Sequence, residues 1–392
     1  MYEIFVGLDI SKSSFAACAI RQEKDKLFEF SAPMNMEGFK ELAQHLSKFS
    51  KDSILIGLES SGCYHINLSS FLSKKGYQMV VINPLLISNF MKLSLRKTKT
   101  DRKDAFAIAC FLTMFYGSLP QSCFLSPDFR ELARERERLS SEIARLKNDI
   151  EKLLSVTFPE LLRATNVYSG AILNLLGHYP SAWMIKSLPA SEIARLIEPK
   201  TRGRKLGISP EELISLARSS IASMSPGREL ILSQKASQLL LLEEELKKLT
   251  DMLTQMCHKS ALEDLRILKS IKGIGDITAL HFLAEIGDVS RFENYKKLIA
   301  YAGLDPTVHQ SGKFEGQSKI SKRGNRHLRR VLWLMATKVA RYNRTFREYF
   351  LRRRAEGISY KKAILAVAHK LIRVIFAMLS HKTCFRVSQN SL

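Results

Sequence analysis

Apolar and polar positions follow two rhythms along the chain, and the first 120 residues mix both. Short runs of β-forming residues predict strands at 2–8, 15–20, 26–30, 54–58 and 77–82. Apolar positions at helical spacing predict helices at 37–49, 60–75 and 105–116. Three strands followed by alternating helices and strands indicate a mixed α/β layer fold.

From residue 129 the pattern becomes purely helical, which adds an all-α part to the α/β part. Apolar residues recur every three or four positions in two long stretches, with charged residues between them. These positions are Leu132, Leu139, Ile143, Leu146, Ile150 and Leu153, then Leu239, Leu242, Leu246, Leu249, Leu253 and Met256. They predict a coiled-coil stalk whose helices pair within one chain or between protomers. Amphipathic helices packed on a core are the alternative.

Two further segments complete the helical part. Residues 160–228 contain several prolines and predict a small helical insertion, whose basic run Thr201–Lys205 is either a solvated loop or a nucleic-acid contact. Further on, Gly273 and Gly275 lie between apolar helix-like flanks and predict a helix-hairpin-helix. Backbone N–H groups at such a turn bind phosphate, and Lys272 adds a cation. A plain helix–helix corner is the alternative.

We therefore expect an α/β domain at 1–120, a helical region at 128–260 and a mainly helical domain at 261–380. The 61 basic residues outnumber the 38 acidic residues, which gives a net charge of +23. This excess indicates an anionic partner, nucleic acid before an anionic membrane. The longest apolar runs are too short, or too interrupted by charge, to span a bilayer, so we expect no membrane-spanning role.

The cysteines and the N-terminus indicate the compartment. The six cysteines are scattered without a C-x-x-C pair, which is typical of reduced cytosolic thiols rather than of zinc ligands or disulfides. The N-terminus enters strand-like sequence directly, so we expect no signal peptide. The chain also lacks a P-loop, a dinucleotide fingerprint and an H-E-x-x-H motif.

Four carboxylates stand at positions where chemistry gathers. Asp9 and Glu59 each come where an apolar strand ends, while Asp101 and Asp104 begin a later helix. Active sites of α/β sheets collect at strand ends, and Mg²⁺ prefers oxygen ligands. Two such ions activate the attacking oxygen and stabilise the leaving oxygen in phosphodiester cleavage. Ordinary loop acids, with Thr100 or Asp101 as a helix cap, are the alternative interpretation.

The segment 298–330 contains candidate nucleophiles beside dense positive charge. A serine hydroxyl attacks phosphate only where its surroundings place it, and the developing negative charge needs nearby cations. Ser311, Ser318 and Ser321 all satisfy these conditions, and each has a bland alternative as a loop or capping serine. Residue chemistry alone does not separate the three.

Four motifs taken together resemble one known family. They are Gly7-Leu8-Asp9-Ile10-Ser11-Lys12, Gly57-Leu58-Glu59-Ser60-Ser61-Gly62-Cys63-Tyr64, Val81-Ile82-Asn83-Pro84 and Lys99-Thr100-Asp101-Arg102-Lys103-Asp104-Ala105. In this order they resemble the DEDD transposase family of insertion sequences. The resemblance implies a RuvC-like (RNase H-type) domain in which Asp9, Glu59, Asp101 and Asp104 hold Mg²⁺, or Mn²⁺ in its place. It also implies that Ser311, in a Gln-Ser-Gly motif, is the nucleophile.

The resemblance implies partners as well. The substrate is DNA, and the RuvC-like domain of one protomer works with the transposase domain of another, so we expect a homo-oligomer, a dimer or a tetramer. Several members of the family are directed by a non-coding bridge RNA, and such members act in the bacterial cytoplasm at the nucleoid. The expected nucleic-acid contacts are Lys99, Arg102, Lys103, Lys272, Gly273, Gly275, Lys319, Lys322, Arg323, Arg326, Arg329 and Arg330.

Four function hypotheses follow. The first is a site-specific recombinase that mobilises its own insertion sequence, with catalytic Asp9, Glu59, Asp101, Asp104 and Ser311. The second is a metal-only nuclease, like a Holliday-junction resolvase, in which Ser311 is structural. The third is an actin-like ATPase or sugar kinase with a phosphate loop at Gly7–Asp9, although the second Gly-rich turn of that fold is missing. The fourth is a non-catalytic DNA-binding scaffold.

Overall fold

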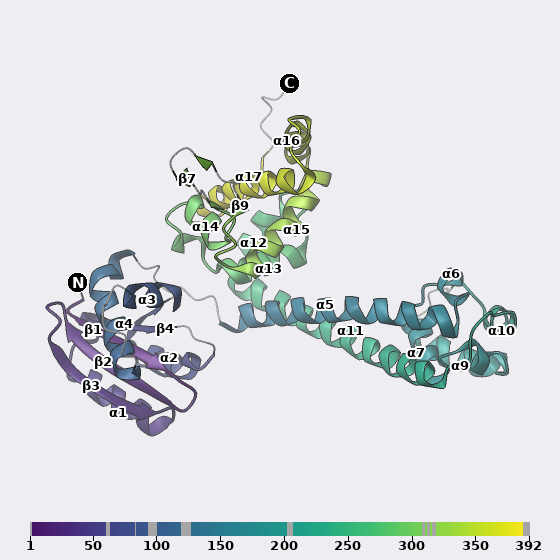
Figure 1. The fold of residues 1–392 in the computed structure, drawn as a ribbon, viewed down its shortest axis with the longest axis horizontal. Helices are drawn as coiled ribbons and strands as arrows, with labels where there is room; N and C mark the ends of the chain where they lie inside the picture. Colours follow the sequence, from purple (N-terminus) through teal and green to yellow (C-terminus); the bar gives the residue numbers. More distant parts are fainter. Residues whose placement is uncertain are drawn as a thin grey trace. The chain divides into compact units, whose positions relative to one another are not determined.

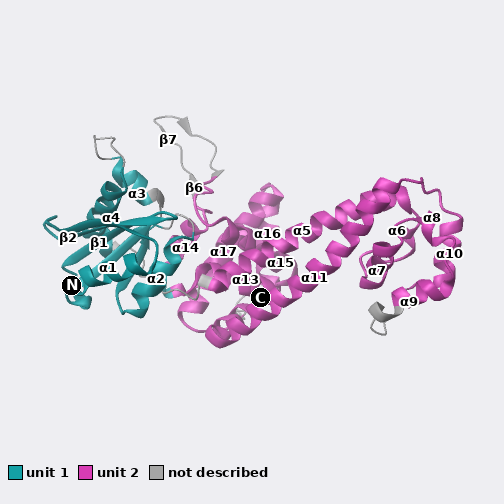
Figure 2. Ribbon diagram, turned by 90° about the horizontal axis from the view of Figure 1, so that it is seen from below, with its two compact units in different colours: residues 1–124, 290–293 teal, residues 125–289, 294–392 magenta. Residues whose placement is uncertain are grey.

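The computed structural model describes residues 2–59, 63–82, 84–92, 100–118, 127–201, 207–307, 310–311, 314–315 and 319–386. The chain forms two compact units (Figure 2). Unit 1 comprises Met1–Phe124 with Ser290–Glu293, and unit 2 comprises Leu125–Val289 with Asn294–Leu392. The finer division of the chain into three domains stays a prediction.

Unit 1 is built on a five-stranded mixed sheet (Figure 1). Its strands are β1 (Ile4–Ile10), β2 (Ser14–Arg21), β3 (Lys26–Pro33), β4 (Ile54–Glu59) and β5 (Gln78–Ile82). They lie in the order β3-β2-β1-β4-β5, with the first three antiparallel and with β4 and β5 parallel to β1. All five predicted strands are present, which confirms the mixed α/β prediction.

Helices cover both faces of this sheet. They are α1 (Met36–Leu46), α2 (His65–Lys74), α3 (Pro84–Met91) and α4 (Asp101–Phe115), with short 3-10 turns at Lys51–Ser53 and Tyr116–Ser118. Side chains of α1 and α2 pack with Ile4, Val6 and Leu8 on one face. Helices α3 and α4 pack with Phe5 and Leu55 on the other face. The inner strands β1, β2 and β4 are therefore buried on both sides, which explains their nearly continuous apolar sequences.

Two glycines let α4 approach the sheet closely. Gly7 and Gly57 are register partners on β1 and β4, and both face α4. A Cβ atom at Gly7 would overlap the Ala105 carbonyl oxygen and would lie 2.6 Å from the Ala109 nitrogen. At Gly57 it would lie 2.6 Å from Cδ1 of Leu112, which is a movable side chain. The backbone of α4 thus rests on a patch of sheet without side chains.

Unit 2 is organised around two long helices. These are α5 (Pro127–Thr157) and α11 (Pro226–Ser260), which lie side by side (Figure 1). Arg136 donates to Thr250 Oγ1 at 2.8 Å, and Lys147 pairs with Glu243 at 2.8 Å, so the residue numbers of α11 fall as those of α5 rise. The helices are antiparallel, and of the two predicted arrangements the structure has the pairing within one chain.

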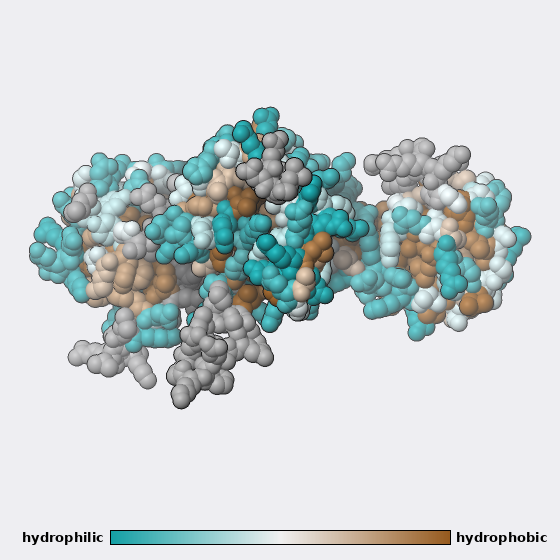
Figure 3. Space-filling model, turned by 90° about the horizontal axis from the view of Figure 1, so that it is seen from above, coloured by the Kyte–Doolittle hydropathy of each residue, from teal (hydrophilic) through white to brown (hydrophobic). Residues whose placement is uncertain are grey.

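The insertion between these helices is helical, as predicted. It contains α6 (Leu161–Ala164), α7 (Gly170–His178), α8 (Ala182–Ile185), α9 (Ala190–Thr201) and α10 (Pro210–Arg218). Their buried side chains share one core with the adjoining ends of α5 and α11. Trp183, Ile221 and Met224 remain exposed, and Figure 3 shows apolar residues at the surface of this end of unit 2. The basic run that follows Thr201 lies outside the described residues.

The C-terminal part of unit 2 is a helical cluster with small strands. It contains α12 (Leu262–Lys269), α13 (Asp276–Ile286), α14 (Tyr295–Tyr301), α15 (Arg326–Tyr342), α16 (Arg344–Ala355) and α17 (Tyr360–Ser380), with a 3-10 turn at Val289–Arg291. Among the described helices, α17 alone is long and apolar enough to cross a bilayer, and half of its most apolar stretch is buried. Its buried residues, from Ala363 to Leu379, pack into the core of the cluster, which explains its apolar composition.

The glycine contact under α4 makes a stability prediction. Gly7→Ala places a methyl group against backbone atoms of α4, which cannot move aside as a side chain can. We therefore expect a loss of about 1–3 kcal/mol in the free energy of unfolding. Gly57→Ala meets only side-chain atoms, those of Leu112 and Ile82, and should cost less. Gly227→Ala, where no atom lies within 4 Å, is the matched control. Urea unfolding monitored by circular dichroism measures all three, and an unchanged midpoint for Gly7→Ala contradicts the prediction.

Candidate active site

Asp9 and Glu59 lie level with each other on neighbouring parallel strands. Leu8 and Leu58 are register partners, so the residues that follow them stand side by side and point to the same face of the sheet. Neighbouring strands run about 4.8 Å apart. One detail differs from the prediction: β1 continues through Asp9 to Ile10, because β2 pairs with it to that point. Asp9 therefore lies inside its strand, whereas Glu59 is the last residue of β4.

Helix α4 brings two more acids toward the same edge. Gly7 shares a strand face with Asp9 and contacts α4 at Ala105, while the Phe5 ring meets the Tyr116 ring, just beyond the end of α4, at 5.4 Å between centroids. Helix α4 thus runs opposite to β1, and its first turn approaches the level of Asp9. That turn carries Asp101, which is exposed, and Asp104, which is only 8% exposed. We expected Thr100 or Asp101 as the helix cap, and the structure has Thr100, whose hydroxyl accepts from the Lys103 nitrogen.

The chemistry of this edge suits a hard cation. Its four candidate donors are all carboxylates, the ligand type that Mg²⁺ takes. They also lie at a helix N-terminus and at strand ends, where sites of α/β sheets are built. In the part of the chain that the structure describes, no three His, Cys, Asp or Glu side chains are arranged to hold a metal ion. The structure sets Asp9 and Glu59 on neighbouring strands and brings the first turn of α4 toward them, while a shared metal site of the four acids stays a prediction.

Ser311 lies in a β-hairpin of unit 2, which we call the Ser311 hairpin (residues 306–320). Its described strands are β6 (Pro306–Thr307), β7 (Gln310–Ser311), β8 (Phe314–Glu315) and β9 (Lys319–Ile320). β6 pairs with β9, and within them β7 pairs with β8, both antiparallel. The backbone of Ser311 is thus part of a two-residue strand, not of the predicted loop. Ser318 lies outside the described residues.

Ser321, the third candidate nucleophile, closes the base of this hairpin. Its hydroxyl donates to Asp305 Oδ1 at 2.6 Å, and its backbone nitrogen donates to the Asp305 carbonyl at 2.8 Å. Gly303 (φ +66°) and Gly324 (φ +144°) lie beside this contact in backbone conformations that favour glycine. Arg329 Nη1 donates to the Ala302 carbonyl at 2.9 Å. Ser321 and Arg329, both predicted to act on nucleic acid, thus make internal bonds that fix the hairpin.

A buried charged network, not anticipated from the sequence, holds the next helix in place. Glu285 on α13 is 2% exposed, and it accepts two hydrogen bonds from Arg134, at 2.7 and 2.8 Å. It also accepts from Asn325 Nδ2 at 2.6 Å, while Oδ1 of Asn325 caps α15 by accepting from the nitrogens of His327 and Leu328. Burial alone would raise the pKa of Glu285, but the bonds from Arg134 and Asn325 outweigh it and hold the pKa below its usual value. The one sequence signal for this network is an acid inside the apolar run of α13.

A second acid joins the same helices. Glu137 on α5 binds His327 Nδ1 at 2.7 Å and Arg330 Nη1 at 2.6 Å. Arg330, a predicted phosphate contact, therefore has an acidic partner inside the protein. Lys322, Arg323 and Arg326 are exposed. The Lys99 residue and the Lys319 side chain lie outside what the structure describes.

The cations on α4 and the predicted helix-hairpin-helix are also placed. Arg102 and Lys103 are exposed on the first turn of α4. Helices α12 and α13 flank a turn in which Gly273 (φ +108°) packs against α15, where a Cβ atom would lie 3.0 Å from the Lys338 carbonyl oxygen. Lys272 and Gly275 are exposed at this turn. Gly273 thus serves the packing of α15, and phosphate binding at the turn stays a prediction.

Comparison with known proteins identifies the family. A mixed sheet with helices on both faces is consistent with the RNase H-like domain of DEDD enzymes, and a family model described as a transposase, of the DEDD type of IS110, matches residues 6–159. A second model, described as the transposase IS116/IS110/IS902 family, matches residues 265–351. Together the two matches cover more than half of the chain. The protein therefore belongs to the IS110-type transposase family of insertion sequences, which confirms the resemblance inferred from its motifs.

Individual relatives agree with this assignment. The chain is 25% identical over 390 residues to an uncharacterised 43.6 kDa protein of insertion element IS110 from Streptomyces coelicolor, covering 97% of this chain and 95% of that protein. It is also 25% identical over 390 residues to the pilin gene-inverting protein of Moraxella bovis, covering 98% of each. A transposase for insertion sequence element IS1111A from Coxiella burnetii is 31% identical over 179 residues, which is 45% of this chain and 49% of that protein.

The Glu285 network makes a pH-dependent prediction. Glu285→Ala removes the carboxylate that Arg134 and Asn325 bind, and water can hydrate the Arg134 side chain because it is 42% exposed, so we expect a loss of about 1–3 kcal/mol at pH 7. Because the folded pKa of Glu285 lies below the unfolded value of 4.5, its contribution is present above that pH and is lost as the pH falls through the folded pKa. The difference from wild type should therefore shrink toward pH 3.

Urea unfolding of both proteins between pH 7 and pH 3 measures this effect. Glu263→Ala, at an exposed glutamate on α12, is the control and should unfold like wild type. A difference between Glu285→Ala and wild type that stays constant down to pH 3 would refute the role given to the ionised carboxylate.

Proposed function

We propose that this chain is the transposase of an insertion sequence and acts as a site-specific DNA recombinase, which cleaves, exchanges and rejoins strands. The observation that carries the proposal is the common edge shared by Asp9, Glu59 and the first turn of α4 in a chain of this family. Relatives support the reaction class, because one is named a pilin gene-inverting protein and another a transposase. The net charge of +23 is that of a protein with a polyanionic partner.

In the proposed reaction, the acids and the serine have separate roles. The oxygens of Asp9, Glu59, Asp101 and Asp104 would hold Mg²⁺ or Mn²⁺, which when bound stabilises negative charge on oxygens of the scissile phosphate. Ser311 Oγ forms a bond to phosphorus while the bond from phosphorus to one deoxyribose oxygen breaks, and that oxygen leaves with a proton. The product is a phosphoserine link, and attack by the hydroxyl of another DNA end reverses the step and rejoins strands. Exposed Lys322, Arg323 and Arg326 would balance the phosphate charge.

The division of the candidate residues between the two compact units bears on the assembly. The acids belong to unit 1 and Ser311 belongs to unit 2. We infer a homo-oligomer, a dimer or a tetramer, in which the acids of one protomer act with Ser311 of another. A non-coding bridge RNA is the proposed guide, because the family includes guided members and the basic surface accommodates RNA as well as DNA. A bacterial cytoplasmic location at the nucleoid follows from this function.

The second candidate function is a metal-dependent, structure-specific endonuclease of the Holliday-junction resolvase type. The gathering of acids on a sheet edge favours it, because such an edge is sufficient for hydrolysis by water. In that case Ser311 would have no chemical role.

Substitutions at the two centres separate the candidates. For a recombinase, Asp9→Asn and Ser311→Ala should each lower strand exchange on supercoiled donor and target DNA by roughly a thousandfold or more, because each removes a group that acts directly on the phosphate. Wild type should also leave a protein–DNA adduct that survives denaturing electrophoresis, and Ser311→Ala should not. Full cleavage by Ser311→Ala, without any adduct in wild type, would favour the endonuclease.

Matched controls keep this test sharp. Asp52→Asn changes an exposed acid of the same unit as Asp9, and Ser260→Ala changes an exposed serine at the end of α11. Both should recombine like wild type. Loss of exchange in either control would mean that the effects at Asp9 and Ser311 are not specific to the chemistry.

Metal removal gives a prediction with a readout besides activity. We expect EDTA to abolish strand cleavage and Mg²⁺ or Mn²⁺ to restore it. Titration of the DNA-free protein with Mn²⁺ in a calorimeter should give heat of binding, because four acids at one edge release mutual repulsion when a cation enters. Asp9→Asn with Glu59→Gln should lose that heat, and equal heat from this double variant would place the metal elsewhere.

A further inference from the structure

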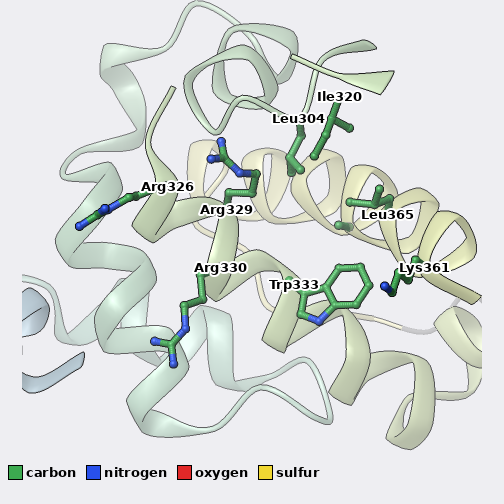
Figure 4. A pocket seen from close by; sticks show the side chains of 9 residues that line it. Leu304, Ile320, Arg326, Arg329, Arg330, Trp333, Lys361 and Leu365 are labelled. Carbon is green, nitrogen blue, oxygen red and sulfur yellow. The ribbon is translucent and has the colours of Figure 1, made fainter. Parts of the chain in front are cut away.

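A pocket opens in unit 2 at the foot of the Ser311 hairpin (Figure 4). Its volume is about 360 Å³, at the small end of the range for ligand pockets. The indole of Trp333 and the aliphatic side chains of Leu304, Ile320 and Leu365 surround the hollow. Ile320 lies on β9, the last strand of the hairpin. The pocket therefore pairs an aromatic platform with apolar walls beside the proposed nucleophile's own hairpin.

Positive charge frames this apolar hollow. Arg326, Arg329, Arg330 and Lys361 also line the pocket. Arg329 and Arg330 are engaged inside the protein, with the Ala302 carbonyl and Glu137. Lys361 is exposed beside Trp333, and no acidic side chain among the described residues pairs with it. Arg326 is exposed too, but its side chain points away from the hollow (Figure 4), and its Nε donates to Nε2 of His327 at 3.3 Å. An occupant with a flat apolar ring and a negative group beside it would match this combination.

The pocket walls are held in place by the surrounding structure. Nε2 of His369 on α17 lies 3.0 Å from the carbonyl oxygen of Leu304 and ties that wall to the helix. Trp333 and Arg326 are both on α15, whose N-terminus Asn325 caps and Glu285 supports. A preformed site of this kind binds without first ordering its own side chains, which lowers the entropic cost of binding.

We propose that this pocket binds one unpaired nucleotide, with its base stacked on Trp333 and its phosphate near Lys361. Base–aromatic stacking tolerates any base, and a basic rim holds the backbone. A paired base is shielded by its neighbours in the stack and cannot enter a pocket, whereas an unpaired one can. The inference rests on the proposed function, since strand exchange and guide pairing both produce unpaired nucleotides near Ser311. DNA and RNA offer the same base and phosphate, so both sources are tested.

The tryptophan content of the chain allows a direct test. The chain has two tryptophans, so Trp183→Phe leaves Trp333 as the sole indole emitter. We expect a 12-nucleotide single-stranded oligonucleotide to quench its fluorescence, and the same sequence as a blunt duplex to bind without comparable quenching. DNA and RNA versions of the oligonucleotide identify the preferred source. Equal quenching by duplex and single strand would overturn the proposal, as would stronger quenching by an acidic aromatic peptide.

Variants then test each part of the pocket. They are made in the wild-type background, which keeps Trp183, and their affinity for a fluorescein-labelled oligonucleotide is measured. Trp333→Ala should weaken single-strand binding by about fivefold to a hundredfold, while Trp333→Phe keeps a stacking ring and most of the affinity. Lys361→Met should lower the slope of log affinity against log salt by about one. Leu334→Ala, an exposed neighbour on α15 outside the pocket lining, is the control and should bind like wild type.

Two comparisons keep failure of this inference apart from failure of the proposed function. Asp9→Asn and Ser311→Ala should abolish recombination yet retain quenching of Trp333, because neither residue lines the pocket. Circular dichroism and thermal melting identify any variant that has simply unfolded. Trp333→Ala that is folded and binds single strands as tightly as wild type would refute the nucleotide pocket and leave the recombinase proposal standing.

Discussion

The contact between the backbone of α4 and the bare patch at Gly7 and Gly57 is the constraint on which unit 1 depends. Close-packed interiors tolerate little change in volume, and at Gly7 the spacing between helix and sheet is set by backbone atoms of α4 that cannot rotate away. The contact fixes both how close the helix lies and how far along the strands it starts. As a result the first turn of α4 comes level with the carboxylates that follow the two glycines by two positions. The same contact therefore determines both the packing of α4 and the position of the acids on its first turn.

In unit 2, hydrogen bonds hold the Ser311 hairpin and the neighbouring helix α15 in place. The Ser311 hairpin has too few residues to form a core of its own, so it needs an external support. Asn325 provides part of it, because its side chain both caps α15 and binds the buried Glu285. Arg134 from the long helix α5 neutralises that acid, so the position of α15 is linked to the long helix pair. A buried pair of this kind contributes orientation more than net stability.

The sequence predicted the regular parts of the fold well because each carried a local signal. Alternating β-forming runs and leucine spacing located the five strands and the long helices, and the acids stood out because they interrupted apolar segments. Three features lacked such a signal. The extension of β1 through Asp9 depends on its pairing with Ala16, the small strand at Ser311 on its pairing with Phe314, and the bond between Arg134 and Glu285 on residues 151 positions apart. Non-local contacts of this kind leave no trace in the spacing of one segment.

The same limit applies to the candidate site. Gly7 and Gly57 were identified only as parts of motifs that also contain acids, and the fold shows that their role is the absence of a side chain beneath α4. Arg329 and Arg330 looked like free cations because the sequence does not reveal that the Ala302 carbonyl and Glu137 occupy them. Only the fold places Trp333 at the edge of a hollow. Residue type was informative about chemistry, and packing decided which residues are available for it.

The antiparallel pairing of α5 and α11 has a consequence for how this architecture varies. Because α5 and α11 are antiparallel, the start of α5 and the end of α11 lie close together, whatever the size of the insertion between the two helices. The hydrogen bond from Arg136 to Thr250 joins α5 and α11 well away from the five small helices. Lengthening, shrinking or replacing those small helices therefore leaves the start of α12 where it was. The far end of the helix pair is therefore a position at which a different module can be accommodated while the helices from α12 onward keep their place.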